Sequence, residues 1–548
     1  MGYLTQSTLP WLTILLLLPL IGALLPLLAG PLRLDDRTVK LGATLWSLLP
    51  LGLVIFLWAG FDATAVAAGQ GVGQYVERIP WGDAQRVDYF VGIDGLSLPL
   101  VVLTAALTPV ALLGSWRVNE RVRLHYALLL LLEAAMLGFF LSLNFFFFFV
   151  FWELSLIPAF FLIDGWGRTD GRRRAALTFV VYTVAASLGL LVLFPLFYLA
   201  TSHAGVPTFD LIELGRLGMG LGGAGLSGDL QTIIFSYLDD SGITAVLGRF
   251  PLLYTSIAFW GIFIGFAVKL AVWPFHTWLP DTYAEAPTAT SVLLAAVMSK
   301  MGAYGMLRVL LPLLPEAARE AAPFVGALAL IGVLVGAFGA LAHVRGDMKR
   351  LIGYTSINHM GYVALAVAAV AASGASADSR TIALNGALFQ MVAHGLSTAA
   401  LFLLAHMIAE RSGGYDATSS GGLRTTAPLL AGLAGVVFFA NLGLPGLAGF
   451  VGEFFIFRGV WAAWPLYALL ATIGLVVTAL ALLRLYGQVF HGKPRDPAAL
   501  QPLAAHELLA VGPLVAALIF FGIYPAPIMD LSNRAALAFA ELLTRLAL

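Results

Sequence analysis

Long apolar segments alternate with short polar ones along almost the whole chain. Apolar runs of about 20 residues, the length that a helix needs to cross a bilayer, recur throughout the sequence. We predict fourteen membrane-spanning helices, near residues 10–29, 42–61, 95–114, 124–143, 145–163, 175–200, 254–279, 287–310, 322–343, 350–371, 382–409, 427–457, 465–486 and 506–525. The first run lacks a basic flank and a cleavage site, so we expect it to be retained as a helix.

The composition agrees with a chain whose solvent is mostly lipid. Hydrophobic residues make up 60% of the 548 residues and charged residues only 11%, against about 25% charged residues in an ordinary soluble domain. The fold class that follows is an all-α polytopic membrane protein. The 30 basic and 30 acidic residues balance, which gives no indication of a nucleic-acid partner. The sequence has no cysteine, which excludes disulfides and thiolate-held Fe–S clusters, so we expect any redox centre in another subunit.

The distribution of basic residues predicts the orientation. Arginine and lysine gather in the connections that follow odd-numbered spans, for example at 117–123 and 168–174. Because positive loops stay on the cytoplasmic side, we place these connections in the cytoplasm and both termini outside. The longest outward connection, residues 201–253, is rich in glycine, and we expect it to be an irregular loop.

Two carboxylates interrupt the apolar runs of the fourth and fifth spans. These spans meet in a tight turn near Leu143, and Glu133 and Glu153 lie on either side of it at equal distances along the chain. At 1.5 Å per residue each carboxylate sits about 15 Å from the turn, near the middle of the hydrocarbon layer. A charge at that depth costs about 3 kcal/mol. One such residue can serve as a protonated hydrogen-bond link between helices, whereas two at one depth favour a functional role.

Four further ionisable residues stand out because they interrupt apolar runs inside predicted spans. They are Lys269 in "GFAVKLAVWPFHTWLP", Lys300 in "LLAAVMSKMGAYG", His394 in "LFQMVAHGLSTAALF" and Glu453 in "LAGFVGEFFIF". A single buried histidine is as often a packing residue as a proton carrier. A row of both signs spread over several helices is different, because burial and opposite charge can together hold the pKa values of its members near neutral pH. Such a row is what proton transfer through a membrane interior requires.

Helix breakers stand beside two of these charges. Pro274 follows Lys269, and the "GLPGLAG" segment with Pro445 precedes Glu453. A proline removes a backbone donor, and the freed carbonyls are tolerated in a membrane only where polar partners or water reach them. The two breaks lie five spans apart, which predicts two inverted five-helix repeats, helices 4–8 and helices 9–13, with helices 7 and 12 broken. We accordingly divide the chain into residues 1–123, 124–310, 311–490 and 491–548, the last with helix 14.

Six ordered motifs carry a resemblance to a known family. The sequence resembles the antiporter-like membrane subunits of respiratory complex I, most closely the M-type subunit of NADH-quinone oxidoreductase, also called subunit 4, which has D-type counterparts in photosynthetic membranes. The likeness runs from about residue 88 to residue 490. Its motifs are "FVFWELSLIP", "PFHTWLPDTYAEAPT", "LLAAVMSKMGAYGMLRV", "GDMKRLIGYTSINHMGYVALA", "FQMVAHGLSTAALFLLAH" and "ANLGLPGLAGFVGEFFIF".

The resemblance implies proton-relay roles at matching positions. These positions are Glu133, Glu153, Lys269, Lys300, His359 in "INHMG", His394 and Glu453. Glu453 stands where the L-type and N-type relatives typically have lysine, which favours the M type. Tyr283 replaces a histidine that is common in relatives, so the resemblance gives that position no relay role.

The function implied by the resemblance is that of a translocase subunit. The protein would couple the oxidation of NADH, or of ferredoxin, by quinone to proton pumping, with no redox site of its own. FMN, Fe–S clusters and quinone are expected in partner subunits, and the partners are the L-type and N-type subunits and the small K, J and A types, together with lipids. The expected location is the bacterial inner membrane, with the thylakoid as the alternative.

Two other functions remain open at this point. Subunits of multisubunit cation/proton antiporters and of membrane hydrogenases share this fold. A non-conducting membrane scaffold is the third possibility, and it predicts that neutralising Lys269 or Lys300 would affect only assembly. Asp281 and Glu285 shape the turn after the seventh span, or alternatively gate the access of protons to Lys269.

Overall fold

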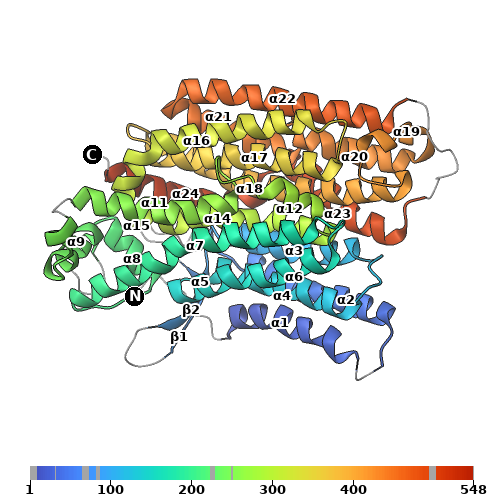
Figure 1. The fold of residues 1–548 in the computed structure, drawn as a ribbon. Coiled ribbons are helices and arrows are strands. Elements are labelled where there is room, and N and C mark those ends of the chain that lie inside the picture. Colours follow the sequence, from blue (N-terminus) through green and yellow to red (C-terminus); the bar gives the residue numbers. More distant parts are fainter. Residues whose placement is uncertain are drawn as a thin grey trace.

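The computed structural model describes residues 9–30, 33–63, 73–81, 87–222, 229–247, 251–492 and 502–546. In these residues the chain is built from helices and one two-stranded antiparallel sheet. Figure 1 shows most of the helices running in one direction as a single bundle. The predicted all-α membrane fold is confirmed, with one hairpin of strands that the apolar pattern did not predict.

The elements follow one another in two groups. The first group is α1 (Trp11–Leu28), α2 (Asp36–Ala59), β1 (Gln74–Pro80), β2 (Asp88–Ile93), α3 (Leu98–Gly114), α4 (Val122–Leu141), α5 (Phe145–Leu154), α6 (Leu156–Trp166), α7 (Arg172–His203), α8 (Leu211–Gly218), α9 (Leu230–Asp240), α10 (Ile243–Leu247), α11 (Pro251–Leu270) and α12 (Leu279–Glu285). The second group is α13 (Thr288–Leu293), the π-helical turn η1 (Leu294–Met298), α14 (Ser299–Gly305), the π-helical turn η2 (Met306–Leu310), α15 (Leu311–Leu313), α16 (Pro315–Ala342), α17 (Met348–Ala371), α18 (Ala377–Ser412), the 3-10 turn η3 (Ala417–Ser419), α19 (Leu423–Thr426), α20 (Pro428–Asn441), α21 (Ala448–Ala463), α22 (Pro465–Phe490), α23 (Ala505–Ile523) and α24 (Ala526–Arg545).

The spans agree with the apolar pattern. Among the described residues, 11 helical segments are long and apolar enough to cross a membrane. Three further segments, α3, α17 and the α20–α21 pair, run beside them in the same layer (Figure 1). Together these segments correspond one by one to the fourteen predicted spans.

The two ends of the bundle carry different structures. Side chains of the basic connections meet at one end, where Lys40 donates to the Trp116 carbonyl and Arg168 pairs with Asp347. The hairpin β1–β2 and helices α8 to α10 gather at the opposite end, on the left in Figure 1. Following the predicted orientation, we call the first the cytoplasmic end and the second the outer end.

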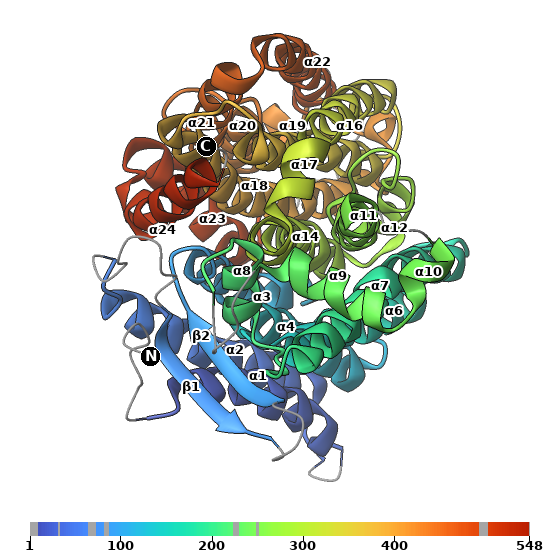
Figure 2. The ribbon, with the colours of Figure 1, turned by 90° about the vertical axis from the view of Figure 1, so that its left-hand side faces the viewer.

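Helix α18 is the centre of the bundle. It runs for 36 residues without a break, and 94% of its most apolar window is buried. Figure 2, which looks along the helices from the outer end, shows α18 surrounded by α17, α20, α21, α23 and α24. A helix of this length spans about 54 Å, so α18 reaches from one end of the membrane layer to the other.

The predicted helix breaks are confirmed. The seventh span stops at Leu270 and resumes as α12 at Leu279, with Pro274 in the gap. The twelfth span stops at Asn441 and resumes as α21 at Ala448, with Pro445 in the gap. The breaks therefore recur five spans apart, as the sequence predicts, whereas the inverted symmetry of the repeats remains a prediction.

The expectation of an irregular loop at 201–253 is wrong for the described part of that segment. Helices α8, α9 and α10 occupy it, with residues 223–228 and 248–250 outside the described residues. Aspartates begin two of these helices: the Asp210 side chain accepts from the backbone N–H groups of Ile212 and Glu213, and Asp229 accepts from that of Thr232. Such N-caps stabilise a helix by about 1 kcal/mol, so short capped helices form where the glycine content indicated a loop.

The C-terminal segment also contains more structure than the single predicted span. Helix α23 corresponds to the predicted span 14, and α24 follows it against α18. Asn533 and Ser532 of α24 both hydrogen bond to Asn385 of α18, at 2.7 and 2.9 Å. Helix α24 is amphipathic rather than uniformly apolar, which is why a search for apolar runs passed over it.

Glycines bring α18 into close contact with α21. A Cβ placed on Gly386 would lie 2.6 Å from the Ile456 nitrogen, and one on Gly459 would lie 2.6 Å from the backbone of Ala383. Neither clash can be relieved by rotating a side chain, because each involves backbone atoms. The close approach of these two helices therefore depends on small residues, as is common in membrane bundles.

We expect Gly386→Ala to lower the stability of the bundle by about 1–3 kcal/mol, because overpacking must push α21 away from α18. The matched control is Gly432→Ala in α20, where an added Cβ meets nothing within 4 Å and helix propensity gains about 1 kcal/mol. The measurement is the midpoint of thermal unfolding in mild detergent. Equal midpoints for the two variants would contradict the close-packing argument.

Candidate functional site

Lys269 is held by backbone and hydroxyl oxygens at a helix junction. It is the second-last residue of α11, just before the break, and it is buried. Its Nζ donates to the carbonyl oxygen of Trp152 (3.1 Å) and to Oγ of Ser155 (3.0 Å), and it lies 3.8 Å from the centre of the Trp152 ring. Ser155 separates α5 from α6, so the ammonium group contacts the fifth span where that span is irregular.

Glu153 lies next to these acceptors without a direct ion pair to Lys269. The lysine Nζ takes the carbonyl of the preceding residue instead, and Oε1 of Glu153 is buried without a hydrogen-bond partner among the described residues. Glu153 is nevertheless the carboxylate whose charge acts on Lys269. The two side chains are thus neighbours, but no hydrogen bond or ion pair joins them among the described residues.

Lys300 lies on a helix that contains two π-helical turns, η1 before it and η2 after it. Its Nζ donates back to the carbonyl of Ala295 in η1 (2.7 Å) and lies 2.6 Å from Nδ1 of His394 on α18. A π turn leaves backbone groups without their usual helical partners, and such turns are frequent at functional sites. Here the turn presents a carbonyl to a lysine that is fully buried.

The two lysines are on helices in direct contact. A Cβ on Gly302 would lie 2.5 Å from the Phe266 carbonyl oxygen and 2.8 Å from the Leu270 nitrogen. Gly302 is two residues from Lys300, and Leu270 adjoins Lys269. The helices α11 and α14 therefore touch beside both lysines, although no hydrogen bond in the described part of the chain links the two ammonium groups.

A continuous row of contacts leads from Lys300 to Glu453. The rings of His394 (α18) and His359 (α17) have centroids 5.5 Å apart, and Nδ1 of His359 lies 3.2 Å from Oε1 of Glu453 on α21. All four residues are buried. We call these four residues, Lys300, His394, His359 and Glu453, the central row.

Gln390 belongs to the central row's surroundings and was missed by sequence reasoning. Its Nε2 lies 3.4 Å from Nδ1 of His359 and donates to Oε1 of Glu453 at 3.5 Å. The signal that could have found it is its spacing, because Gln390 precedes His394 by four residues and so shares its helix face. Gln390 was missed because its side chain is a neutral amide and the sequence was searched for buried charges.

The break in the twelfth span brings its backbone against Glu453. Gly443 adopts φ +67°, and a Cβ there would lie 2.4 Å from Oε2 of Glu453. Only glycine suits both the left-handed conformation and the small space. The predicted association between this break and the carboxylate is therefore a direct contact.

Glu133 stands apart from the other members. It is fully buried on α4, and neither carboxylate oxygen has a hydrogen-bond partner among the described residues. Its polar neighbour is Thr108 of α3, and no contact joins it to Glu153 in that part of the chain. Among the described residues no hydrogen bond therefore joins the two carboxylates that the sequence placed at one depth.

An ion pair lies about two helical turns from Lys300, towards the outer end of the bundle. Arg308 in η2 pairs with Asp94, at the start of the third span, and its Nε donates to the Tyr304 hydroxyl (3.1 Å). Tyr304 in turn donates to the carbonyl of Phe140 (3.3 Å). These residues occupy successive turns beyond Lys300, and sequence reasoning did not single them out because an arginine near the end of a span looks like an ordinary flank.

The turn residues Asp281 and Glu285 are engaged at the cytoplasmic end. Asp281 pairs with Arg350 at 2.9 Å, and Glu285 accepts from the hydroxyl of Thr169 at 2.7 Å. The first contact joins α12 to the start of α17, and the second joins the end of α12 to the connection between α6 and α7. In the described residues no group of three His, Cys, Asp or Glu side chains could hold a metal ion.

Comparison with known proteins assigns the family. Residues 142–480 match the NADH:quinone oxidoreductase/Mrp antiporter transmembrane family. The chain is 34% identical over 531 residues to the F(420)H(2) dehydrogenase subunit M of Methanosarcina mazei, covering 95% of this chain and 96% of that one. It is 33% identical over 528 residues to the NADH-quinone oxidoreductase subunit M of Rickettsia bellii, covering 95% and 97%.

Solved structures agree on the fold. A chain of respiratory complex I from Thermus thermophilus with bound NADH superposes with a TM-score of 0.77 at 28% identity, covering 97% of this chain and 99% of that chain. A chain of the Mrp complex from Dietzia sp. gives a TM-score of 0.74 at 20% identity, covering 98% and 100%, which shows a shared fold. This chain is therefore a member of the NADH:quinone oxidoreductase/Mrp antiporter family of membrane proteins.

Proposed function

We propose that this chain is the proton-translocating M-type membrane subunit of a redox complex of the complex I type, located in a bacterial plasma membrane. The observation that carries the proposal is the central row, in which Lys300, His394, His359 and Glu453 follow one another across the bundle inside the membrane layer. A scaffold has no need of such a row, because each buried charge costs about 3 kcal/mol to insert.

The first step concerns Glu153 and Lys269. Glu153 directly follows Trp152, and the carbonyl and hydroxyl oxygens of Trp152 and Ser155 hold the ammonium group of Lys269 in place. A shift of the fifth span at the Ser155 junction moves the carboxylate and these acceptors together. Such a movement, driven by the redox reaction elsewhere in the complex, would release the proton from Lys269 towards Lys300 on the touching helix α14.

The second step uses the two nitrogens of each imidazole. His394 receives the proton at Nδ1, which faces Lys300, and releases one from Nε2, which has no hydrogen-bond partner among the described residues. Nε2 of His359 is likewise without a partner there, and its Nδ1 faces Glu453. One bridging water between the Nε2 atoms would complete the path. Each ring thus takes a proton on one side and passes a proton from the other.

The rest of the proposal concerns partners. FMN, Fe–S clusters and quinone would belong to partner subunits, since this chain has no cysteine to ligate a cluster. L-type and N-type subunits and the small K, J and A types would lie beside it in the membrane.

The names of two relatives differ in the donor they state, F(420)H(2) and NADH, so the membrane subunit is compatible with more than one donor module. Residues 124–310 and 311–490 would be the two inverted repeats, with 1–123 and 491–548 flanking them.

Replacing Lys300 with methionine tests the proposed function itself. We expect Lys300→Met to slow proton translocation through this subunit by roughly 10²-fold or more, because the row loses its central proton carrier. The control is Lys40→Met, which removes another buried lysine whose Nζ binds the Trp116 carbonyl at the cytoplasmic end. The measurement is the ratio of protons to electrons in vesicles that contain the assembled complex. A wild-type ratio in Lys300→Met would contradict the proposed function.

The two carboxylates of the fourth and fifth spans should differ. Glu153→Gln keeps the side-chain shape and removes the charge beside Lys269, so we expect pumping to slow about tenfold or more. Glu133→Gln should have a milder effect, because neither Glu133 oxygen has a hydrogen-bond partner among the described residues, whereas Glu153 adjoins the Trp152 carbonyl that binds Lys269. Pumping rates at equal assembly decide the order, and a larger loss from Glu133→Gln would reverse it.

The last member of the row should need a titratable group. Glu453→Asp keeps a carboxyl one methylene shorter, so we expect partial pumping. Glu453→Ala should stop pumping and leave a cavity beside the break, at a cost of about 2–4 kcal/mol. The proton-to-electron ratio and the unfolding midpoint measure the two effects separately. If Glu453→Ala pumps at the wild-type ratio, Glu453 is not on the path.

A further inference from the structure

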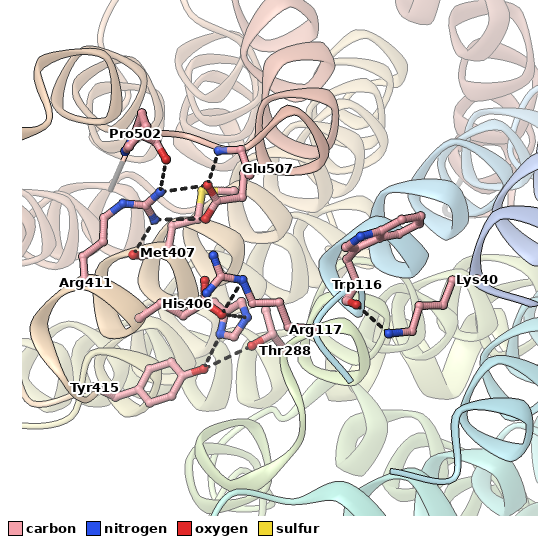
Figure 3. Close-up of polar contacts among 12 residues, drawn as sticks. Lys40, Trp116, Arg117, Thr288, His406, Met407, Arg411, Tyr415, Pro502 and Glu507 are labelled. Atoms are coloured by element: carbon pink, nitrogen blue, oxygen red, sulfur yellow. Dashed lines mark hydrogen bonds and ion pairs between the residues drawn. The ribbon is translucent and has the colours of Figure 1, made fainter. Parts of the chain in front are cut away.

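A second group of polar side chains lies at the cytoplasmic end, outside the central row. It consists of Arg117 after α3, His406 and Glu410 in the last turns of α18, Tyr415 in the following connection, and Thr288 at the start of α13. We call these five residues the cytoplasmic cluster. Figure 3 shows His406 between Arg117 and Tyr415, with Tyr415 reaching Thr288.

The cluster is an unbroken string of contacts. Oε1 of Glu410 lies 3.2 Å from Nε of Arg117 and 3.4 Å from Nε2 of His406. Nδ1 of His406 lies 2.9 Å from the Tyr415 hydroxyl, which lies 3.3 Å from Oγ1 of Thr288. Both imidazole nitrogens therefore have partners, a carboxylate on one side and a hydroxyl on the other.

The two ends of this string differ in exposure. The side chains of Arg117, Glu410 and His406 are 44%, 18% and 28% exposed, whereas Thr288 at the other end is 6% exposed. A small pocket between α3, α18 and α23 is lined by Arg117, His406 and Glu410. One end of the string therefore meets solvent, and the other end is inside the bundle.

Polar atoms continue inward from Thr288. Helix α13 leads into η1 and to Lys300, twelve residues away, or about 18 Å. The Ser291 hydroxyl donates to the Tyr283 carbonyl, and the Tyr283 hydroxyl donates to the Leu294 carbonyl, one residue before the carbonyl that holds Lys300.

Two buried hydroxyls along this route are unengaged. Oγ1 of Thr290 on α13 and Oγ1 of Thr398 on α18 have no hydrogen-bond partner among the described residues, and both side chains are fully buried. The two helices pack against each other, and Thr398 is one turn from His394. Buried hydroxyls normally find a partner, so these two atoms point to a further polar occupant between the cluster and the row.

A nearby ion pair shows what a purely structural contact looks like here. Arg411 and Glu507 make two hydrogen bonds, at 2.9 and 2.8 Å, and both side chains are 4% exposed (Figure 3). Such a bidentate pair fixes α18 to α23 without a group that titrates easily. The cytoplasmic cluster instead places an imidazole between a carboxylate and a hydroxyl, an arrangement suited to passing protons.

We propose that the cytoplasmic cluster is the proton-loading site of the central row, with Glu410 as the acceptor from the cytoplasm and His406 as the carrier to Tyr415 and Thr288. The inference rests on the proposed function. Each step moves one proton: His406 gains it at Nε2 from Glu410 and loses one from Nδ1 to the Tyr415 oxygen, while the tyrosine gives its own proton to Thr288. The threonine hydroxyl in turn releases its own proton inward, along α13. Burial raises the pKa of Tyr415, so it acts as a neutral hydroxyl rather than as a tyrosinate.

Charged and other titratable groups face His406 from every element packed against it. They are Arg117 after α3, Lys349 on α17, Glu410 on α18 itself, Tyr415 in the connection, and His506 and Glu507 on α23. The cations among them oppose a positive charge on the imidazole, and the carboxylates of Glu507 and Glu410 favour it. A proton that reaches His406 is therefore held only while Glu410 is ionised, which favours transfer onward once Glu410 takes the next proton.

The test uses Glu410→Gln and His406→Gln in the assembled complex in vesicles whose cytoplasmic face is outside. We expect proton translocation to slow about three- to tenfold near pH 8 and to recover towards the wild-type rate near about pH 6, where protons are more abundant. Electron transfer with an uncoupler present should stay at the wild-type rate. The matched controls are Glu120→Gln and His491→Gln, exposed residues of the same end, which should pump as the wild type does.

Two results would overturn the inference. One is a wild-type pumping rate at both pH values in Glu410→Gln and His406→Gln while Lys300→Met is inactive. The other is a loss that is equal at both pH values, which marks a structural clamp. If Lys300→Met itself pumps normally, the proposed function fails first, so the two failures are distinguishable.

A third variant tests the inference if Glu410→Gln and His406→Gln assemble poorly. Tyr415→Phe keeps the ring against Arg168, whose guanidinium carbon lies 4.9 Å from the ring centroid, and removes only the hydroxyl between His406 and Thr288. We expect the same pH-dependent slowing, about threefold near pH 8. A wild-type rate at both pH values in Tyr415→Phe would overturn the route through this hydroxyl.

Discussion

The uninterrupted course of α18 is the constraint on which the rest of the structure depends. Its 36 residues carry Gln390, His394, His406 and Glu410 on one rigid rod, so the spacing between the cytoplasmic cluster and the central row cannot change without moving the whole helix. Close packing at Gly386 fixes α21, and with it Glu453, against the same rod. In a bilayer an intact helix satisfies its own backbone hydrogen bonds, so α18 stays straight without help from water or from neighbouring side chains.

Irregular backbone appears next to the buried charges instead. The Ser155 junction adjoins Glu153, the first break follows Lys269, a π turn precedes Lys300, and the second break precedes Glu453. In two of these places a backbone carbonyl, from Trp152 or Ala295, accepts a hydrogen bond from a lysine. Carbonyls stabilise an ammonium group without fixing its charge as strongly as a carboxylate does, which keeps both charge states accessible. This explains why Lys269 is held by oxygens of the fifth span while Glu153 stays beside it.

The spans and the two broken helices could be predicted because apolar length, proline and glycine determine them locally. Helix α24 could not, since half of its surface is polar, and neither could α8 to α10, whose aspartate caps stand in a glycine-rich segment. Six ionisable residues were found as interruptions of apolar runs, namely Glu133, Glu153, Lys269, Lys300, His394 and Glu453. Gln390 was missed because it is neutral, and the pair of Arg308 with Asp94 was missed because its members are far apart in the sequence. The π turns have no local signature at all.

In the proposed path, the Arg308–Asp94 pair would give proton movement along the central row its direction. A proton on Lys300 has three ways to leave: towards the cytoplasm through the hydroxyls of α13, sideways to His394, or outward along its own helix. The outward way meets Tyr304 and then Arg308, whose guanidinium stays protonated at any working pH and so cannot accept a proton. At about 12 Å along the helix and an effective dielectric constant of about 20, the arginine alone would repel a proton on Lys300 by about 1.4 kcal/mol, an effect that Asp94 reduces. His394 lies 2.6 Å from Lys300 and can accept a proton. Once a proton has been loaded from the cytoplasm, transfer from Lys300 to His394 on α18 is therefore the favoured step.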